Sequence, residues 1–163
     1  MECRHSPVMT DFPNIIESKI ISQEYNDLWS ELKLPATVNE VAKTLVLCAA
    51  YAAGGAAEMQ LTKMMQACKL TETDYNTIQV EEGKAIAWHQ LRDALKPKYV
   101  VLLGVHPQQL GISALFHLFA PTRFNDTIWI AGPSLQDLEK QPEAKKQLWL
   151  NGLKPVFVDN ATN

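Results

Sequence analysis

Two short runs of almost entirely apolar residues constrain the fold of this chain more than any other feature. They are Thr44–Ala49, which reads Thr-Leu-Val-Leu-Cys-Ala, and Tyr99–Val105, which reads Tyr-Val-Val-Leu-Leu-Gly-Val. A strand with one face in water alternates apolar and polar residues, whereas a strand covered on both faces is apolar throughout. Both runs are far shorter than the roughly 20 residues that cross a bilayer. They therefore predict buried strands of a parallel sheet and no contact with a membrane.

Amphipathic helices are predicted between the strands. After Gly54 and Gly55, apolar residues recur at helical spacing and polar residues take the other side. The apolar positions are Ala57, Leu61, Met64, Met65 and Cys68, and the polar positions are Glu58, Gln60, Lys63, Gln66 and Lys69. A second helix is expected from Gly83 to just before Pro97, because proline cannot continue a helix.

The carboxy-terminal half continues the pattern. Further strands are expected at Tyr75–Val80 and Thr127–Ala131, and Ser134, three residues before Asp137, predicts a helix start with a capping box. Pro142 fits the first turn of a renewed helix. Gly152 is expected to end that helix, and Pro155–Val158 to form a short edge strand.

This alternation predicts a three-layer α/β/α domain over residues 37–163, with a central, mostly parallel sheet and right-handed crossovers. Residues 1–36 stand outside it and are expected to form a helical amino-terminal arm. Ile16, Ile20, Leu28 and Trp29 are the arm's candidate partner-binding residues, since tryptophan is enriched at binding hot spots. The arm either packs back onto the body or docks into a partner's groove.

Composition narrows the function classes. With 163 residues, 47% of them hydrophobic, the chain is long enough to bury one core. Its net charge of −3 gives no general attraction to a polyanion, so no direct nucleic-acid partner is predicted. The first ten residues lack the pattern of a secretory signal, and the odd number of cysteines suggests no disulfide framework. The expected location is therefore the cytoplasm.

The best candidate site lies at the carboxyl ends of the predicted strands, where open α/β sheets usually bind ligands. His106, Pro107, Gln108 and Gln109 follow the second apolar run, and Ser134 follows the last strand. A catalytic role for His106 is only the alternative interpretation. Acid–base chemistry requires a partner group, and none is close to His106 in sequence. No cofactor motif or metal-ligand spacing is present, so neither is predicted. Gly54 and Gly55 favour close packing. The alternatives are a phosphate held by their exposed N–H groups and a small-molecule site formed together with the His106 loop.

One stretch resembles a known family. Pro133-Ser134-Leu135-Gln136-Asp137-Leu138, followed by Pro142, Lys146, Leu148 and Trp149, is similar to the carboxy-terminal signature of the bacterial DNA polymerase III psi subunit. The order and approximate spacing of the preceding strands and helix also agree, so the resemblance spans roughly Lys43 to Gly152. Residues Asp11 to Leu34 do not align one by one with the family's clamp-loader-binding peptide.

The resemblance implies a non-catalytic adaptor of the replicative clamp-loader assembly. In that family the amino-terminal peptide attaches to the clamp loader, and the body binds the chi subunit, which contacts single-stranded-DNA-binding protein. The family's body is similar to the uracil-DNA glycosylase fold. Two stretches of this chain, Gly104-Val105-His106-Pro107 and Pro133-Ser134, resemble the loop signatures of that fold. In this chain His106 stands where those enzymes have an asparagine. A base-excision hydrolase therefore ranks second, after the adaptor.

Overall fold

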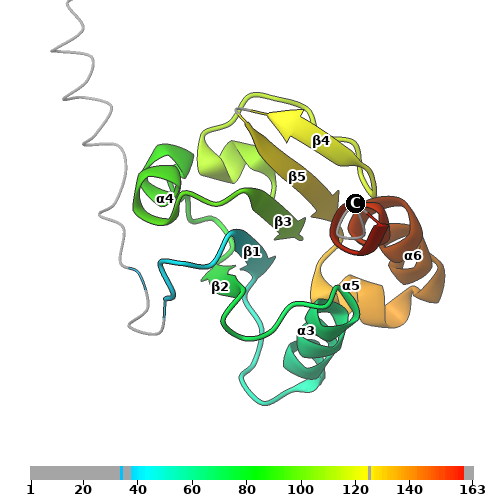
Figure 1. The fold of residues 1–163 in the computed structure, drawn as a ribbon. Helices are drawn as coiled ribbons and strands as arrows, with labels where there is room; N and C mark the ends of the chain where they lie inside the picture. Colours follow the sequence, from blue (N-terminus) through cyan, green and yellow to red (C-terminus); the bar gives the residue numbers. More distant parts are fainter. Residues whose placement is uncertain (1–33, 35–37, 125, 160–163) are drawn as a thin grey trace, which may run out of the picture. The chain divides into compact units, whose positions relative to one another are not determined.

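The computed structural model describes Leu34 and residues 38–124 and 126–159 of the chain (Figure 1). In this part of the chain the strands form a sheet in the order β2-β1-β3-β5-β4. The strands are β1 Thr44–Ala49, β2 Tyr75–Val80, β3 Tyr99–Leu103, β4 Pro121–Phe124 and β5 Thr127–Gly132. β1 pairs in parallel with β2 and β3, β3 pairs in parallel with β5, and β4 pairs antiparallel with β5. The prediction of an α/β fold with a mostly parallel sheet is therefore confirmed.

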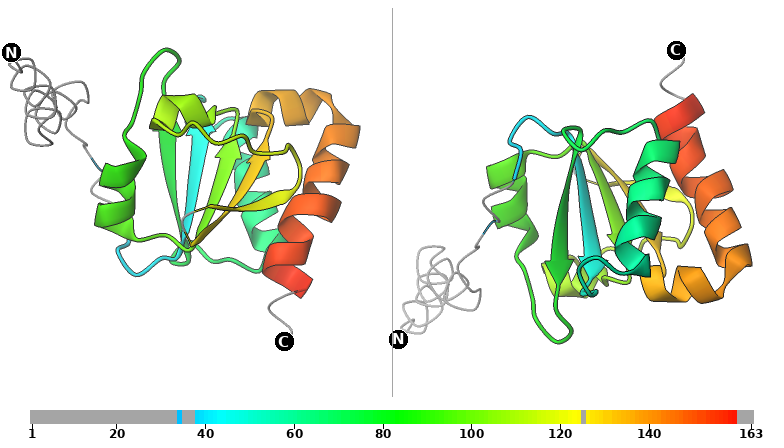
Figure 2. Two further views of the ribbon diagram at one scale, coloured as in Figure 1. Left: turned by 90° about the horizontal axis from the view of Figure 1, so that it is seen from above. Right: turned by 90° about the horizontal axis from the view of Figure 1, so that it is seen from below.

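Helices cover both faces of this sheet (Figures 1 and 2). They are α3 Ala56–Ala67, α4 Trp88–Leu95, α5 Leu135–Lys140 and α6 Pro142–Gln147, together with a 3₁₀ turn, η1 Pro107–Leu110, and a π-helical segment, η2 Leu148–Asp159. Residues of α3, α5 and η2 belong to the hydrophobic cluster on one face, and residues of α4 to the cluster on the other.

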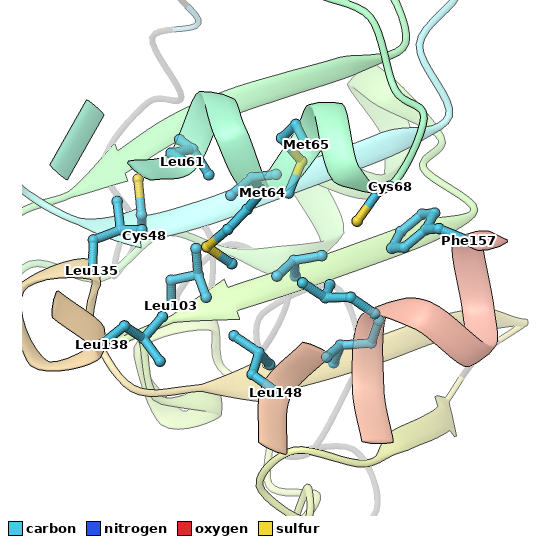
Figure 3. Packing of buried hydrophobic residues seen from close by; sticks show 14 of the residues in the cluster. Cys48, Leu61, Met64, Met65, Cys68, Leu103, Leu135, Leu138, Leu148 and Phe157 are labelled. Atoms are coloured by element: carbon cyan, nitrogen blue, oxygen red, sulfur yellow. The ribbon is translucent and has the colours of Figure 1, made fainter. Parts of the chain in front are cut away.

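Successive residues of β1 explain why the strand is apolar throughout. Val46 and Cys48 pack into the cluster of α3, whereas Leu45 and Leu47 pack into the cluster of α4. All four are at most 1% exposed. Figure 3 shows the first cluster, in which Met64, Leu138 and Phe157 arrive from three different helical segments. A strand whose two faces are both covered therefore carries mostly apolar side chains.

The order of the strands places a switch point in the middle of the sheet. The chain leaves β1 for β2 on one side and then returns past β1 to β3 on the other. The connecting helices α3 and α4 lie on opposite faces. At such a point the connections diverge and leave a crevice beyond the carboxyl ends of the two central strands.

The second helix begins later than its pattern predicts. Gly83 has a φ of +77° and belongs to a turn, and the helix starts only at Trp88. The preceding backbone is extended because the Ile86 amide donates to the Gln109 carbonyl at 2.9 Å, which ties this segment to η1. The expected end is confirmed, since the helix stops at Leu95, two residues before Pro97.

The carboxy-terminal expectations for Gly152 and Pro155–Val158 are wrong. The helical path continues through both to Asp159. Leu148, Leu153, Val156 and Phe157 recur at helical spacing on the side that packs into the core. Gly152 is small for a packing reason: a Cβ there would lie 2.9 Å from Cγ2 of Ile130.

Gln60 also departs from its predicted place. The residue pattern places Gln60 on the polar side of its helix, but it is only 7% exposed. It lies three residues after Ala57, a spacing that brings two side chains to the same face of a helix. Among the helices of the described residues, none is long and apolar enough to cross a membrane.

Candidate functional site

A hollow of about 680 Å³, here called the strand-end cleft, lies beyond the carboxyl ends of four strands. It is lined by Ala49, Ala50, Val80, Glu82, Gly83, Lys84, Ala85, Gly104, His106, Gln108, Gln109, Ser134 and Gln136. These residues follow β1, β2, β3 and β5, so the cleft opens at the switch point of the sheet. Four of the five residues predicted for the strand-end site line this cleft.

Gly104 and Ser134 hold the loops after β3 and β5 together. The Gly104 amide donates to the Gly132 carbonyl at 3.0 Å. A Cβ on Gly104 would lie 2.7 Å from Cβ and 2.9 Å from Cα of Ser134, closer than side chains approach one another. The φ of Gly104 is +78°, a conformation that favours glycine. Glycine at this position therefore permits the contact between the two loops.

The two glutamines of the predicted site have different roles. Gln109 is committed to structure: its Oε1 accepts from the His106 amide at 3.0 Å and its Nε2 donates to the Lys84 carbonyl at 3.4 Å. Gln108 is exposed, and so is the ring of His106. Pro107 occupies the first position of η1, where its missing amide hydrogen costs nothing. His106 and Gln108 are thus the side chains of this loop that remain available to a ligand.

Ser134 caps α5, as predicted. Its Oγ accepts from the Asp137 amide at 3.2 Å and donates to Oδ2 of Asp137 at 2.9 Å. The Asp137 carboxylate therefore accepts a hydrogen bond from the Ser134 hydroxyl. No hydrogen bond between described residues joins the His106 ring to Ser134 or to Asp137.

A second hollow of about 450 Å³, here called the leucine groove, adjoins the cleft. It is lined by Gly104, Val105, His106, Pro107, Gln108, Ala114, Leu115, Phe116, Leu118, Ala131, Gly132, Pro133, Ser134 and Asp137. Leu115 is 86% exposed and Leu118 is 60% exposed. Asp137 and His106 both line this groove, which sequence reasoning missed because their positions are 31 apart in the chain.

The segment that carries the exposed leucines is held at both ends. Ile112 is buried, and its amide donates to the Pro107 carbonyl at 3.0 Å. Leu118 forms a parallel bridge with Ala131, and the Phe119 amide donates to the Ala131 carbonyl at 2.8 Å. Between these anchors Phe116 stacks on the buried Trp129, with 5.1 Å between ring centroids. Leu115 and Leu118 are therefore presented outward from an anchored segment.

The glycine pair before α3 does not favour a phosphate site. The Gly54 amide donates to Oε2 of Glu58, so a carboxylate already occupies the position that an anion would take. Gly54 has a φ of +72° and supplies a tight turn. The packing interpretation of Gly54 and Gly55 is the one that this geometry favours.

Neither buried cysteine offers a reactive thiolate. Burial raises the pKa of both Cys48 and Cys68 to about 12, which keeps these thiols neutral. The described residues contain no cluster of three or more histidine, cysteine or acidic side chains placed to hold a metal ion. The predicted partner-binding residues Ile16, Ile20, Leu28 and Trp29 lie outside the described residues.

No protein-family model matches the chain, and no significant match is found among functionally characterised proteins.

Proposed function

We propose that this protein is a non-catalytic adaptor of the replicative DNA polymerase clamp-loader assembly, acting through protein–protein contacts. The observation that carries the proposal is the leucine groove with its two outward leucines. Leucines exposed to 86% and 60% beside an apolar groove are typical of a surface that a partner covers. The similarity of Pro133–Trp149 to the psi subunit signature supports the identity of the assembly.

The charges around the strand ends also favour an adaptor. A protein that holds DNA neutralises phosphates with lysine and arginine. Neither residue type occurs among the described residues that line the leucine groove. The strand-end cleft contains Lys84, and this side chain is already paired with Glu81.

The proposal assigns two contacts to two parts of the chain. The leucine groove receives a chi-like subunit, and the arm, through Ile16, Ile20, Leu28 and Trp29, attaches to the clamp loader. Purified chain, clamp-loader complex and chi-like subunit from the same cell are mixed and separated by size-exclusion chromatography. All three are expected to elute together.

Two variants separate the contacts. A Leu115→Ser/Leu118→Ser double variant is expected to release the chi-like subunit while the clamp loader stays bound. Deletion of residues 1–33 is expected to do the reverse. Both substituted leucines are exposed, so the double variant should keep the melting temperature of the parent. An unmodified chain that binds neither protein at micromolar concentration would refute the adaptor role.

A base-excision hydrolase is the second candidate, and the position of Asp137 favours it. Asp137 and His106 both line the leucine groove, although the Asp137 carboxylate accepts a hydrogen bond from the Ser134 hydroxyl. A carboxylate and an imidazole together can position water for attack on a sugar. This function requires release of free base from uracil-containing or mismatched duplexes, with loss of release in His106→Ala and Asp137→Asn. Absence of release from the unmodified chain across such a panel excludes it.

A further inference from the structure

A third hollow lies away from the strand ends, between α3 and the carboxy-terminal helices, and is here called the α3–η2 hollow. It is lined by Gln60, Lys63, Met64, Ala67, Lys145, Trp149 and Leu153. None of these residues lines the strand-end cleft or the leucine groove. Figures 1 and 2 show that α3 and η2 cover the same side of the sheet. The hollow is therefore a different place on the body from the strand-end cleft and the leucine groove.

The size and walls of the hollow suit one apolar side chain. Its volume is about 160 Å³, close to the roughly 150 Å³ of an apolar cavity that holds benzene. Met64 and Leu153 are buried and form its floor with the core, and Trp149 is half-buried beside them. An indole with one side uncovered offers a rigid apolar surface for a second ring or branched chain.

The rim of the hollow is positively charged. Lys63 comes from α3 and Lys145 from α6, both are exposed, and neither forms an ion pair with another described residue. No acidic side chain is among the residues that line the hollow. Two ammonium groups around an apolar recess attract a segment that is acidic on both sides of an apolar anchor.

Gln60 adds a hydrogen-bond donor that has no acceptor. Its side chain is 7% exposed and lines the hollow, and its buried Nε2 has no partner in the described part of the chain. Burial of an amide without a partner costs about 1–3 kcal/mol. The terminal torsion of glutamine is soft, so Nε2 can turn toward a carbonyl oxygen that enters the hollow.

We propose that the α3–η2 hollow binds an acidic peptide that inserts one apolar side chain between Trp149 and Leu153. Lys63 and Lys145 hold the flanking carboxylates, and Gln60 donates to a main-chain carbonyl of the peptide. η2 contributes two of the lining residues from a π-helical segment, a rare conformation that is frequent at functional sites.

Fluorescence anisotropy of the full chain with labelled synthetic peptides tests this proposal. The probe has a central phenylalanine flanked by aspartates and glutamates. One matched peptide replaces the phenylalanine with alanine, and another replaces the acidic residues with asparagine and glutamine. Only the first peptide is expected to bind well, with affinity that falls as salt rises. Equal binding of the uncharged peptide, or no binding of the first peptide, overturns the proposal.

Substitutions locate the contact. A Lys63→Gln/Lys145→Gln variant is expected to bind about fivefold more weakly, whereas Lys146→Gln, an exposed lysine of α6 that does not line the hollow, should change the affinity less than about twofold. Gln60→Leu is expected to raise the melting temperature of the protein, because it removes a buried amide that has no partner. The same variant should bind the peptide more weakly, because it also removes the hydrogen-bond donor. Unchanged affinity in the double lysine variant overturns the assignment of the hollow as the binding site.

Discussion

At Gly104 a single hydrogen in place of a methyl group allows the loops after β3 and β5 to touch. Gly83 has almost the same φ, +77° against +78°, but no atom lies within 4 Å of its ideal Cβ position. The two glycines share the conformational requirement and differ in the contact. Comparison of the same substitution at both positions therefore isolates the contact between the loops.

We expect Gly104→Ala to lower the free energy of unfolding by about 2–4 kcal/mol, because the new Cβ overlaps backbone and side-chain atoms of Ser134. Gly83→Ala should lower the free energy of unfolding by only about 1 kcal/mol, which is the cost of holding alanine at a positive φ. Urea denaturation of both variants beside the parent measures the difference. Equal losses would show that the loops separate freely.

Cys48 and Cys68 provide a pH-dependent prediction. Burial raises the pKa of each thiol to about 12, whereas a cysteine in the unfolded chain titrates near about 8.5. Between these values the folded state keeps protons that the unfolded state has lost, so these thiols lower stability as pH rises from about 8.5 toward about 12.

We expect both thiols to react with a disulfide reagent at pH 8.5 only as fast as the protein opens, because the thiolate is the reactive form. In a Cys3→Ser background the folded chain should label far more slowly than the urea-unfolded chain. The measurement is the absorbance of the released reagent anion over time. Labelling of the folded protein at the unfolded rate would contradict the burial of these side chains.

Secondary structure in the sheet follows closely from residue patterns. β1 and β2 match their predicted ranges, and α3 contains four of the five apolar positions predicted for its helix, because each segment is long enough for its apolar pattern to be read. β4 was not predicted, since Pro121–Phe124 has four residues, begins with proline and is only partly covered. The helical path through Gly152 and Pro155 was mispredicted because contact with Ile130, which lies far away in sequence, determines the residue at 152.

The candidate site was partly predictable for the same reason. His106 and Ser134 could be placed because strand ends share one edge of a parallel sheet. Leu115 and Leu118 could not, because the segment before β4 has no period and its course depends on packing against Trp129. Asp137 was predictable only as the capping partner of Ser134. Gln60 is an intermediate case, since its spacing from Ala57 indicated burial while its polarity indicated exposure.

Trp129 of β5 contacts side chains or backbone from three neighbouring segments. Its side chain is fully buried, its Nε1 donates to the Phe124 carbonyl at 3.3 Å, and its ring lies 4.5 Å from that of Trp88 between centroids. Phe116, from the segment that presents the leucines, stacks on its face. The indole therefore connects β4, α4 and the leucine groove.

We expect Trp129→Ala to cost about 3–5 kcal/mol, since it opens a large cavity in this cluster. Trp129→Phe keeps a ring but loses the donor, and should cost about 1–2 kcal/mol. Chemical denaturation gives both values, and binding of the chi-like subunit should weaken in the alanine variant before global unfolding. A Trp129→Phe variant as unstable as the alanine variant would show that the hydrogen bond outweighs the packing.

At the scale of the whole molecule, the described members of both hydrophobic clusters come from Leu34 and residues 38–124 and 126–159. Leu34 and Val38 pack against the cluster that contains Leu45 and Trp88, so the body extends amino-terminal to its first strand. Two clusters that share the central strands should unfold together, because loss of either one exposes a face of the same sheet.

We therefore expect a chain that begins at Leu34 to fold and to unfold in one cooperative transition. Its free energy of unfolding should lie within about 1 kcal/mol of the full chain, because the described core residues of both clusters are retained. A matched chain that begins at Asn39 loses Leu34 and Val38 and should be less stable, by about 1–3 kcal/mol for the uncovered apolar area. Calorimetry and urea denaturation monitored by tryptophan fluorescence measure both truncations. If the chain that begins at Leu34 lost its cooperative transition, residues 1–33 would be part of the folding unit, and their deletion would no longer separate the clamp-loader contact from the stability of the body.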